Sequence, residues 1–414
     1  MQIFIGNNTF DQKPVVWKMP VNSHWCVIGA TGVGKTFRLR RLLQQFQKHP
    51  LRIHLFDCHG DLATDQGSTS SVTFSEGSPY GINPLAINPD PDFGGVRRRT
   101  NSFLSMVNRY TSRLGVKQEA VLRNLLVDLY AANKFYLDRP DSWGAIGKKT
   151  PAIGDLLRFS HAKLKTFYMG DANKATSHLE TLCRKLASLD KKVASPDEEM
   201  LVEKLRQDCK EKYAAFIDNL KTGREVDDLI KYDSKDVLRS VYNRVNNLNS
   251  LGIFRDREAP FHPMAPIWRY DIRSLTAEEQ GFLVEVNLER IFAEARQNGI
   301  VSEINTLIVL DEAQKYLSEE PDHIVNVMIR ESRKFGIGMI FASQDLQSFP
   351  DIVVTSCATK LILGVDELHH DYLTRKLGIE AKKLRFIRPR QTGLIQIKRE
   401  NALTSNKYVE VQFN

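Results

Sequence analysis

The sequence predicts an α/β protein: a core with a mostly parallel sheet and flanking helices, interrupted by a mostly helical insert. Short apolar runs alternate with amphipathic stretches near both ends of the chain, as in βα units. Between residues 97 and 249, apolar residues instead keep helical spacing almost throughout. The length of 414 residues suits two units, and 42% hydrophobic with 26% charged residues excludes a collagen-like, disulfide-scaffold or wholly disordered chain.

The core elements are expected in a definite order. Two half-apolar runs joined by a polar turn predict an N-terminal hairpin of residues 1–5 and 15–19. Thr276 and Glu279 form a capping-box pattern, which predicts a helix that begins there and ends near Asn298. Further strands are expected at 24–29, 51–56, 268–272, 305–310, 337–342, 360–364, 393–398 and 408–413, and further helices at 36–47 and 324–334.

The predicted domains are a discontinuous core, 1–95 with 261–414, and a helical insert, 96–260. A loop rich in Pro, Asn, Asp and Gly at 88–95 marks the first junction. The whole chain carries a formal charge of +8, yet Arg97–Pro260 alone holds 31 basic and 22 acidic residues. The insert is therefore where a polyanion would be expected to bind. Within it, residues 191–212 are highly charged and are expected to form an exposed helical hairpin.

Cysteine use and hydropathy indicate the compartment. The five cysteines are scattered and form no CxxC pair, a reduced pattern without zinc-site spacing. Residues 1–13 are too polar for a signal peptide, and no apolar run approaches the roughly 20 residues that span a bilayer. We therefore expect a cytoplasmic protein with no integral membrane segment, and leave peripheral attachment at the inner face of the membrane open.

A phosphate-binding loop follows the expected strand at 24–29. The segment matches GxxxxGK[ST] at every fixed position and lies between an apolar strand and an amphipathic helix, as the chemistry requires. Its glycines let the backbone approach a polyphosphate, Lys35 would reach the β and γ phosphates, and Thr36 would hold Mg²⁺. The expected nucleotide-binding residues are Gly29, Ala30, Thr31, Gly32, Val33, Gly34, Lys35 and Thr36.

A pair of carboxylates follows the apolar strand at 305–310. Asp311, at the end of a core strand, can bind the Mg²⁺ held by the phosphate loop. Glu312 can orient or deprotonate the attacking water. The sequence thus predicts nucleoside triphosphate hydrolysis, with ATP and Mg²⁺ as cofactors, rather than phosphate transfer to a small molecule.

Three residues after the carboxylates are further catalytic candidates. Arg330 and Arg333 lie on the expected helix at 324–334, and an arginine supplied by a neighbouring subunit can stabilise a transferring phosphate. Gln344 follows the next strand and could sense the γ phosphate or position water. The alternative for each of the three is a purely structural role.

A second-strand site is expected at Asp57 and His59. Both follow the strand at 51–56, near where the phosphates should lie. They could polarise water or couple the nucleotide to a loop, and a simple turn is the alternative. Five basic residues between Lys382 and Arg390 could contact phosphates of nucleic acid or of nucleotide, or form a solvated face.

These motifs together resemble the HerA–FtsK superfamily of ring-shaped motor ATPases. The ordered set is GATGVGKT, LFDCHGDL, NTLIVLDEAQKYL and RESRKFGIGMIFASQ, which together with the neighbouring strands covers roughly half of the chain. LFDCHGDL, the Asn-Pro-Leu at 83–85 and RKFGIGMIFASQ are most similar to the conjugative branch, the type IV secretion ATPases and coupling proteins, with HerA nearly as close. The resemblance implies a RecA-like P-loop core and a homo-hexamer with nucleotide between subunits. It also raises Gln344 as a polar sensor and favours Arg333 over Arg330.

Two functions are compatible with this resemblance. The first is an ATP-driven ring motor that translocates DNA, whose backbone a basic insert can contact without sequence preference. The second is a peripheral ATPase of a type IV secretion-like complex at the membrane that acts on protein partners.

Overall fold

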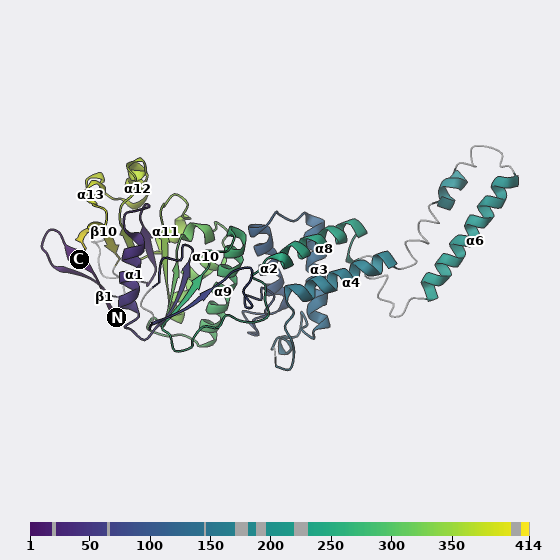
Figure 1. Ribbon diagram of the computed structural model, residues 1–414, viewed down its shortest axis with the longest axis horizontal. Coiled ribbons are helices and arrows are strands. Elements are labelled where there is room, and N and C mark those ends of the chain that lie inside the picture. Colours follow the sequence, from purple (N-terminus) through teal and green to yellow (C-terminus); the bar gives the residue numbers. More distant parts are fainter. Residues whose placement is uncertain are drawn as a thin grey trace. The chain divides into compact units, whose positions relative to one another are not determined.

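The computed structural model describes residues 1–18, 22–63, 67–144, 146–169, 181–187, 196–218, 231–398 and 407–413. The chain forms two compact units, Met1–Pro84 with Gly252–Asn414, and Leu85–Leu251. In Figure 1 both chain ends lie in the first of these units. The first unit contains the sheet and the second is helical, so the predicted fold class is confirmed.

The sheet of the first unit has eleven strands among the described residues, in the order β2-β1-β11-β10-β9-β3-β8-β7-β4-β6-β5. From β9 to β5 all pairs are parallel, whereas β10, β11, β1 and β2 add antiparallel strands at one side. The strands are β1 (Gln2–Asn8), β2 (Pro14–Lys18), β3 (Trp25–Ile28), β4 (Arg52–Asp57), β5 (Thr69–Thr73), β6 (Ile267–Asp271), β7 (Thr306–Leu310), β8 (Ile337–Ser343), β9 (Thr359–Ile362), β10 (Thr392–Ile397) and β11 (Val409–Gln412).

Both faces of the central parallel strands β3, β8, β7 and β4 are buried, which explains their largely apolar sequences. Alternate residues such as Val27 and Val309 belong to a core cluster with helix α1 (Lys35–Phe46). The residues between them, such as Leu310 and Phe341, are also fully buried. Trp17, Trp25 and Phe46 pack with ring centroids 5.3–6.1 Å apart. The hairpin β1–β2 is thereby fixed to the sheet and α1.

The helices of the first unit connect the strands. The capping box at Thr276 and Glu279 is present at the start of α9, so this prediction is confirmed. The predicted helix at 324–334 is shorter, because α10 ends at Glu331 and a 3₁₀ turn leads to Gly336, whose φ of 73° closes it. The helices after α1 are α9 (Ala277–Gln297), α10 (Ile324–Glu331), α11 (Asp351–Ser356), α12 (His370–Leu377) and α13 (Ala381–Phe386).

Several elements were not expected from the sequence. Strand β5 is polar (TSSVT) and occupies an edge, so it lacks an apolar run. The helices α11, α12 and α13 are six to eight residues long, too short for a periodic signal. Met19, the last residue of the expected second strand, lies outside the described residues.

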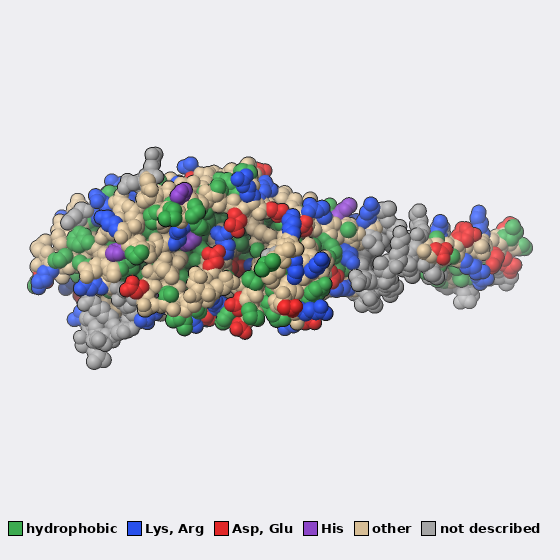
Figure 2. All heavy atoms as spheres, turned by 90° about the horizontal axis from the view of Figure 1, so that it is seen from below, with side chains coloured by type: hydrophobic (Ala, Val, Ile, Leu, Met, Phe, Trp, Pro, Cys, Tyr) green, Lys and Arg blue, Asp and Glu red, His purple; other side chains and the backbone are tan. Residues whose placement is uncertain are grey.

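The second unit is a group of helices, of which α2, α3, α4 and α8 pack on one another. Their apolar faces form its interior, with fully buried side chains such as Phe103, Leu125, Leu156 and Val241. Its helices include α2 (Val96–Tyr110), α3 (Val116–Ala132), α4 (Ile153–Met169), α6 (Pro196–Asp218) and α8 (Lys235–Ser250). Acidic and basic side chains are mixed along α6, at the right of Figure 2. Of the expected charged hairpin, 191–195 lie outside the described residues.

The second unit and the predicted insert, 96–260, overlap but differ at both ends. Leu85 already belongs to the helical unit, where its carbonyl accepts a hydrogen bond of 2.8 Å from the Tyr130 hydroxyl. Gly252 belongs to the sheet unit, where its N–H donates to the Glu279 carboxylate at 3.2 Å. Side-chain contacts of this kind leave no sequence signal at the boundary.

Candidate functional site

The phosphate-binding loop lies at the carboxyl edge of the parallel strands, between β3 and α1. Gly32 and Gly34 have φ of 84° and 100°, a backbone region that residues with a Cβ rarely adopt. A Cβ on Gly29 would lie 2.8 Å from Val33 Cγ2, so only glycine fits there. The loop ends at Lys35, the first residue of α1, so the N-terminus of that helix faces the site.

A cavity of about 1110 Å³ opens at this loop. Its walls include residues Ala30–Thr36 other than Val33, the acidic pair Asp311 and Glu312, and Gln344. Because β8 lies next to β3 and β7 next to β8, and all three strands are parallel, the residues that follow them converge at one edge of the sheet. The structure thus brings together residues that are up to 315 positions apart, from Gly29 to Gln344.

Glu312 is the centre of a polar network in this cavity. Its Oε1 accepts hydrogen bonds from Lys35 Nζ at 2.5 Å and Gln344 Nε2 at 3.1 Å. Its Oε2 accepts one from Gln314 Nε2 at 2.7 Å. Gln344 Oε1 in turn accepts a hydrogen bond from the Thr31 hydroxyl at 2.7 Å. Gln344 therefore links the phosphate-binding loop to Glu312.

The backbone at Glu312 is unusual. Its φ of 49° lies in the left-handed region, which is uncommon for a residue other than glycine, asparagine or aspartate. Such a conformation costs free energy and persists only where the surroundings impose it. Here it lets the chain turn directly from β7 into the 3₁₀ helix at Ala313–Tyr316, with the carboxylate held beside Lys35.

The two carboxylates have opposite pKa shifts. Burial raises the pKa of Asp311 to about 6, with Lys35 Nζ at 3.8 Å opposing the shift. Burial also acts to raise the pKa of Glu312, but hydrogen bonds from Lys35, Gln314 and Gln344 outweigh it and lower the pKa to about 2. Glu312 is therefore ionised at neutral pH, the form that can accept a proton or orient water.

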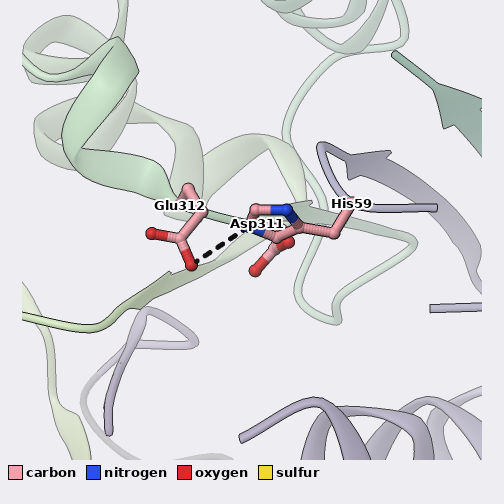
Figure 3. A group of neighbouring side chains, drawn as sticks. All are labelled: His59, Asp311 and Glu312. Carbon is pink, nitrogen blue, oxygen red and sulfur yellow. Dashed lines mark ion pairs between the residues drawn. The ribbon is translucent and has the colours of Figure 1, made fainter. Parts of the chain in front are cut away.

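Oxygen ligands for a hard cation gather next to the acidic pair. The Thr36 hydroxyl donates to Asp61 Oδ2 at 3.1 Å, and carboxylate oxygens of Asp57, Asp61 and Asp311 lie within 4.8 Å of one another. His59 Nε2 lies 3.6 Å from Glu312 Oε1, the contact drawn as a dashed line in Figure 3. Hydroxyl and carboxylate oxygens are the donors that Mg²⁺ prefers, so Thr36, Asp61 and Asp311 fit this ion.

Asp57, in contrast, is used by the fold. Its carboxylate is fully buried and accepts hydrogen bonds from the N–H groups of His59, Gly60 and Leu62 at 2.8–3.2 Å. It also pairs with Arg269, whose Nε and Nη2 lie 2.8 and 2.7 Å from Oδ2. These contacts favour the turn that sequence reasoning offered as the alternative for Asp57, and leave His59, half exposed, as the cavity-lining member of the pair.

Arg330 and Arg333 lie away from this cavity. The segment after α10 returns to the amino end of the sheet, where Gly336 adjoins Asn305 at the start of β7. Arg330 is exposed and its Nη2 donates to the Pro321 carbonyl at 2.7 Å. Arg333 is exposed on the 3₁₀ turn that precedes β8. The phosphate loop is at the carboxyl end of the strands, so neither arginine adjoins the site of its own chain.

Sequence reasoning missed three residues of this site. Asp61 bonds to Thr36, Gln314 bonds to Glu312, and Arg390 lines the cavity beside Gly34. Asp61 and Gln314 belong to the segments DCHGD and DEAQ, so their proximity to candidates was a signal. Arg390 was noted only as the end of a basic stretch, because nothing in the sequence shows that its turn contacts the phosphate loop.

No helix of the described residues is long and apolar enough to cross a membrane. A model of the central domain of the helicase HerA matches residues 3–116. No curated protein sequence matches the chain.

Solved structures share the whole fold. VirB4 of Thermoanaerobacter pseudethanolicus is 15% identical, with a TM-score of 0.62 over 100% of this chain and 96% of that one. The plasmid coupling protein TrwB in complex with ADP and Mg²⁺ is 13% identical, with a TM-score of 0.52 over 95% of this chain and 85% of that one. TrwB has also been solved with a non-hydrolysable ATP analogue, at a TM-score of 0.53. The ordered motifs, the match to HerA and this RecA-like fold together confirm the resemblance of the chain to the HerA–FtsK superfamily.

Proposed function

We propose that the chain is an ATP-hydrolysing motor that works as a ring and translocates DNA. One observation carries the hydrolytic part: Lys35, Thr31, Gln344 and Glu312 form one hydrogen-bonded network in a cavity at the phosphate-binding loop. A nucleotide-binding protein without turnover would not need an ionised carboxylate held beside the phosphate lysine.

The residues of the network have separate tasks in this proposal. Lys35 has three donors on Nζ, of which Glu312 uses one, so the others are available to the β and γ phosphates. Thr36 and Asp311 would hold Mg²⁺, which would neutralise charge on the phosphates. Glu312 orients the attacking water and accepts its proton. Gln344 positions Glu312 and, through Thr31, responds to the occupancy of the phosphate loop.

Translocation of DNA is supported by the similarity to HerA and by the charge of the insert. The similar structures include proteins described as a VirB4 and as conjugative coupling proteins, at identities of 12–15%. The surplus of basic residues between Arg97 and Pro260 can bind a phosphate backbone through charge alone. In a homo-hexamer with the nucleotide between subunits, Arg333 would face the nucleotide of a neighbouring subunit, because it lies at the opposite end of the sheet from the site of its own chain.

The test is the rate of ATP hydrolysis by the purified protein, at low salt, with duplex DNA, single-stranded DNA and no DNA. The proposal predicts a basal rate that DNA increases, and a stimulation that weakens as salt rises, because the contacts are to phosphates. Hydrolysis without any DNA binding or stimulation would exclude translocation of DNA. Stimulation by a membrane-complex protein instead would establish the secretion alternative.

A further inference from the structure

The cavity extends to both sides of the phosphate-binding loop. In the sheet β8 and β7 lie on one side of β3, and Gln344 and Glu312 follow them. On the other side lie β9, β10 and β11. Since β10 is antiparallel to β9 and to β11, its first residue, Thr392, pairs with Gln412 at the end of β11. This pair therefore lies at the same edge as the phosphate loop, opposite the acidic pair.

The turn that leads into β10 is fastened to the phosphate loop. Arg390 has a φ of 64°, which lets its N–H donate to the Val33 carbonyl at 3.0 Å. The Arg390 carbonyl accepts a hydrogen bond from Arg38 Nη2, on α1, at 3.0 Å. The next residue, Gln391, accepts a hydrogen bond of 2.8 Å at its carbonyl from the N–H of Phe413. The backbone of Gln391 is thus held in place.

Arg38, Phe413, Gln391 and Gln412 form this wall of the cavity, and they combine planar groups with exposed side-chain amides. The Arg38 guanidinium lies 3.9 Å from the ring centroid of Phe413, and both residues are largely buried. Gln391, in the turn before β10, and Gln412, at the end of the neighbouring strand β11, are exposed and line the cavity. A guanidinium and an aromatic ring offer planar faces for stacking, and amides offer both a donor and an acceptor to a base edge.

We infer that this wall binds the nucleoside of the nucleotide, with Gln391 and Gln412 as base- and ribose-contacting residues and Arg390 as the brace of the turn. The inference rests on the function proposed above. Lys35 reaches the β and γ phosphates from the side of Glu312, so the nucleoside end of a triphosphate has the opposite wall available. The cavity of about 1110 Å³ is large enough for a whole nucleotide.

The experiment separates contacts to the nucleoside from contacts to the phosphates. Calorimetry measures the Kd of MgATP and of magnesium tripolyphosphate, which lacks base and ribose, for the wild type and for the double variant Gln391→Ala, Gln412→Ala. We expect the Kd of ATP to rise about tenfold, since a lost hydrogen bond is worth roughly two- to tenfold each. The Kd of tripolyphosphate should stay unchanged, which also shows that the variant is folded.

Two controls make the result specific. Gln297→Ala removes an exposed glutamine at the end of α9, outside the cavity, and should change neither Kd. Lys35→Ala should weaken both ligands; if it weakens neither, the proposed nucleotide site itself is wrong. An unchanged Kd of ATP in the double variant, or an equal loss for ATP and tripolyphosphate, would overturn the nucleoside assignment while leaving the nucleotide site intact.

Discussion

Lys35 and Glu312 are 277 positions apart and form the shortest ion pair of the site, at 2.5 Å. Each is largely buried, so neither charge is well hydrated. A substitution of either residue therefore leaves the charge of the other buried without its counter-charge, so variants of this pair should have large effects. In our proposal Lys35 binds the phosphates and Glu312 activates water. Substitution of Lys35 should therefore weaken ATP binding, whereas substitution of Glu312 should slow hydrolysis.

Lys35→Ala should abolish measurable ATP binding, because the phosphates lose their charged partner and Glu312 keeps its negative charge nearby. We expect at least a 100-fold rise in the Kd of ATP, measured by calorimetry with Mg²⁺. Lys407→Ala, an exposed lysine away from the cavity, is the matched control and should bind as the wild type does. Normal ATP binding by Lys35→Ala would show that the phosphate-binding loop does not bind ATP through Lys35.

Two buried histidines should make the fold sensitive to acid. Burial lowers the pKa of His24 to about 4, and burial with the nearby charges of Arg290 and Arg52 lowers the pKa of His54 to about 3. Between the ordinary pKa of 6.5 and these values, the unfolded chain binds protons that the folded chain does not. The free energy of unfolding should therefore fall as pH drops from 6.5 towards 4, by about 1.4 kcal/mol per pH unit for each histidine.

Chemical unfolding at a series of pH values measures this slope. The raised pKa of Asp311 acts in the opposite direction below pH 6 and offsets part of it. His24→Leu should flatten the acid side of the profile, whereas His49→Gln, at a half-buried position after α1, should not. A slope that His24→Leu leaves unchanged would contradict the assignment to this residue.

At the scale of elements, the loop after β4 depends on one buried ion pair. Asp57 joins β4, its following loop and Arg269 of β6. Gly60 in the same loop has a φ of 76°, and a Cβ there would lie 2.6 Å from Arg273 Cδ. The loop carries His59 and Asp61 into the cavity, so its shape decides whether these side chains reach the site.

Asp57→Asn should destabilise the protein by about 3 kcal/mol, because it leaves the Arg269 charge buried with Asp271, at 3.7 Å, as a more distant partner. Thermal unfolding measures the change. Glu258→Gln, which removes an exposed partner of Arg290 in the same unit, is the control and should have little effect. Equal effects of the two substitutions would show that Asp57 is not the anchor of the loop.

The sequence predicted the elements whose signal is local. Buried parallel strands such as β7 and β8 are recognised in the sequence as apolar runs. Helix α9 is recognised by its capping box. The same reasoning placed Lys35, Asp311 and Glu312 after the correct strands. It could not place Arg390 or Gln412 at the cavity, because their contacts depend on an antiparallel pairing at the side of the sheet. It could not detect the polar edge strand β5 either.

At the scale of the whole molecule, the position of Arg333 bears on whether the protein acts as an oligomer. Arg333 lies at the amino end of the sheet and the phosphate loop at the carboxyl end, so any catalytic role requires a second copy. This agrees with the ring that we propose, in which one subunit completes the site of the next. In a motor that acts as a monomer, substitution of Arg333 would leave the rate of ATP hydrolysis unchanged.

Mixing two inactive variants tests this point. Arg333→Ala should bind ATP normally and lose turnover by at least about 100-fold, as expected for an arginine that stabilises the transferring phosphate. Mixed with Glu312→Gln, it should regain part of the activity, because some interfaces then combine an intact Glu312 with an intact Arg333. A mixture of Arg330→Ala with Glu312→Gln serves as the comparison. Absence of any rescue would assign Arg333 to the structure of its own chain.

The most direct test of the account is the turnover of Glu312→Gln compared with the wild type, with ATP binding measured on the same samples. Glutamine keeps the size of the side chain and one acceptor oxygen for Lys35 and Gln344, but its NH₂ group cannot accept the hydrogen bond from Gln314, and the amide does not take up a proton. We predict hydrolysis by the wild type, and a variant that binds ATP but hydrolyses it at least about 100-fold more slowly. Equal turnover in the two proteins, or no hydrolysis by the wild type, would contradict the claim that this cavity is a hydrolytic site.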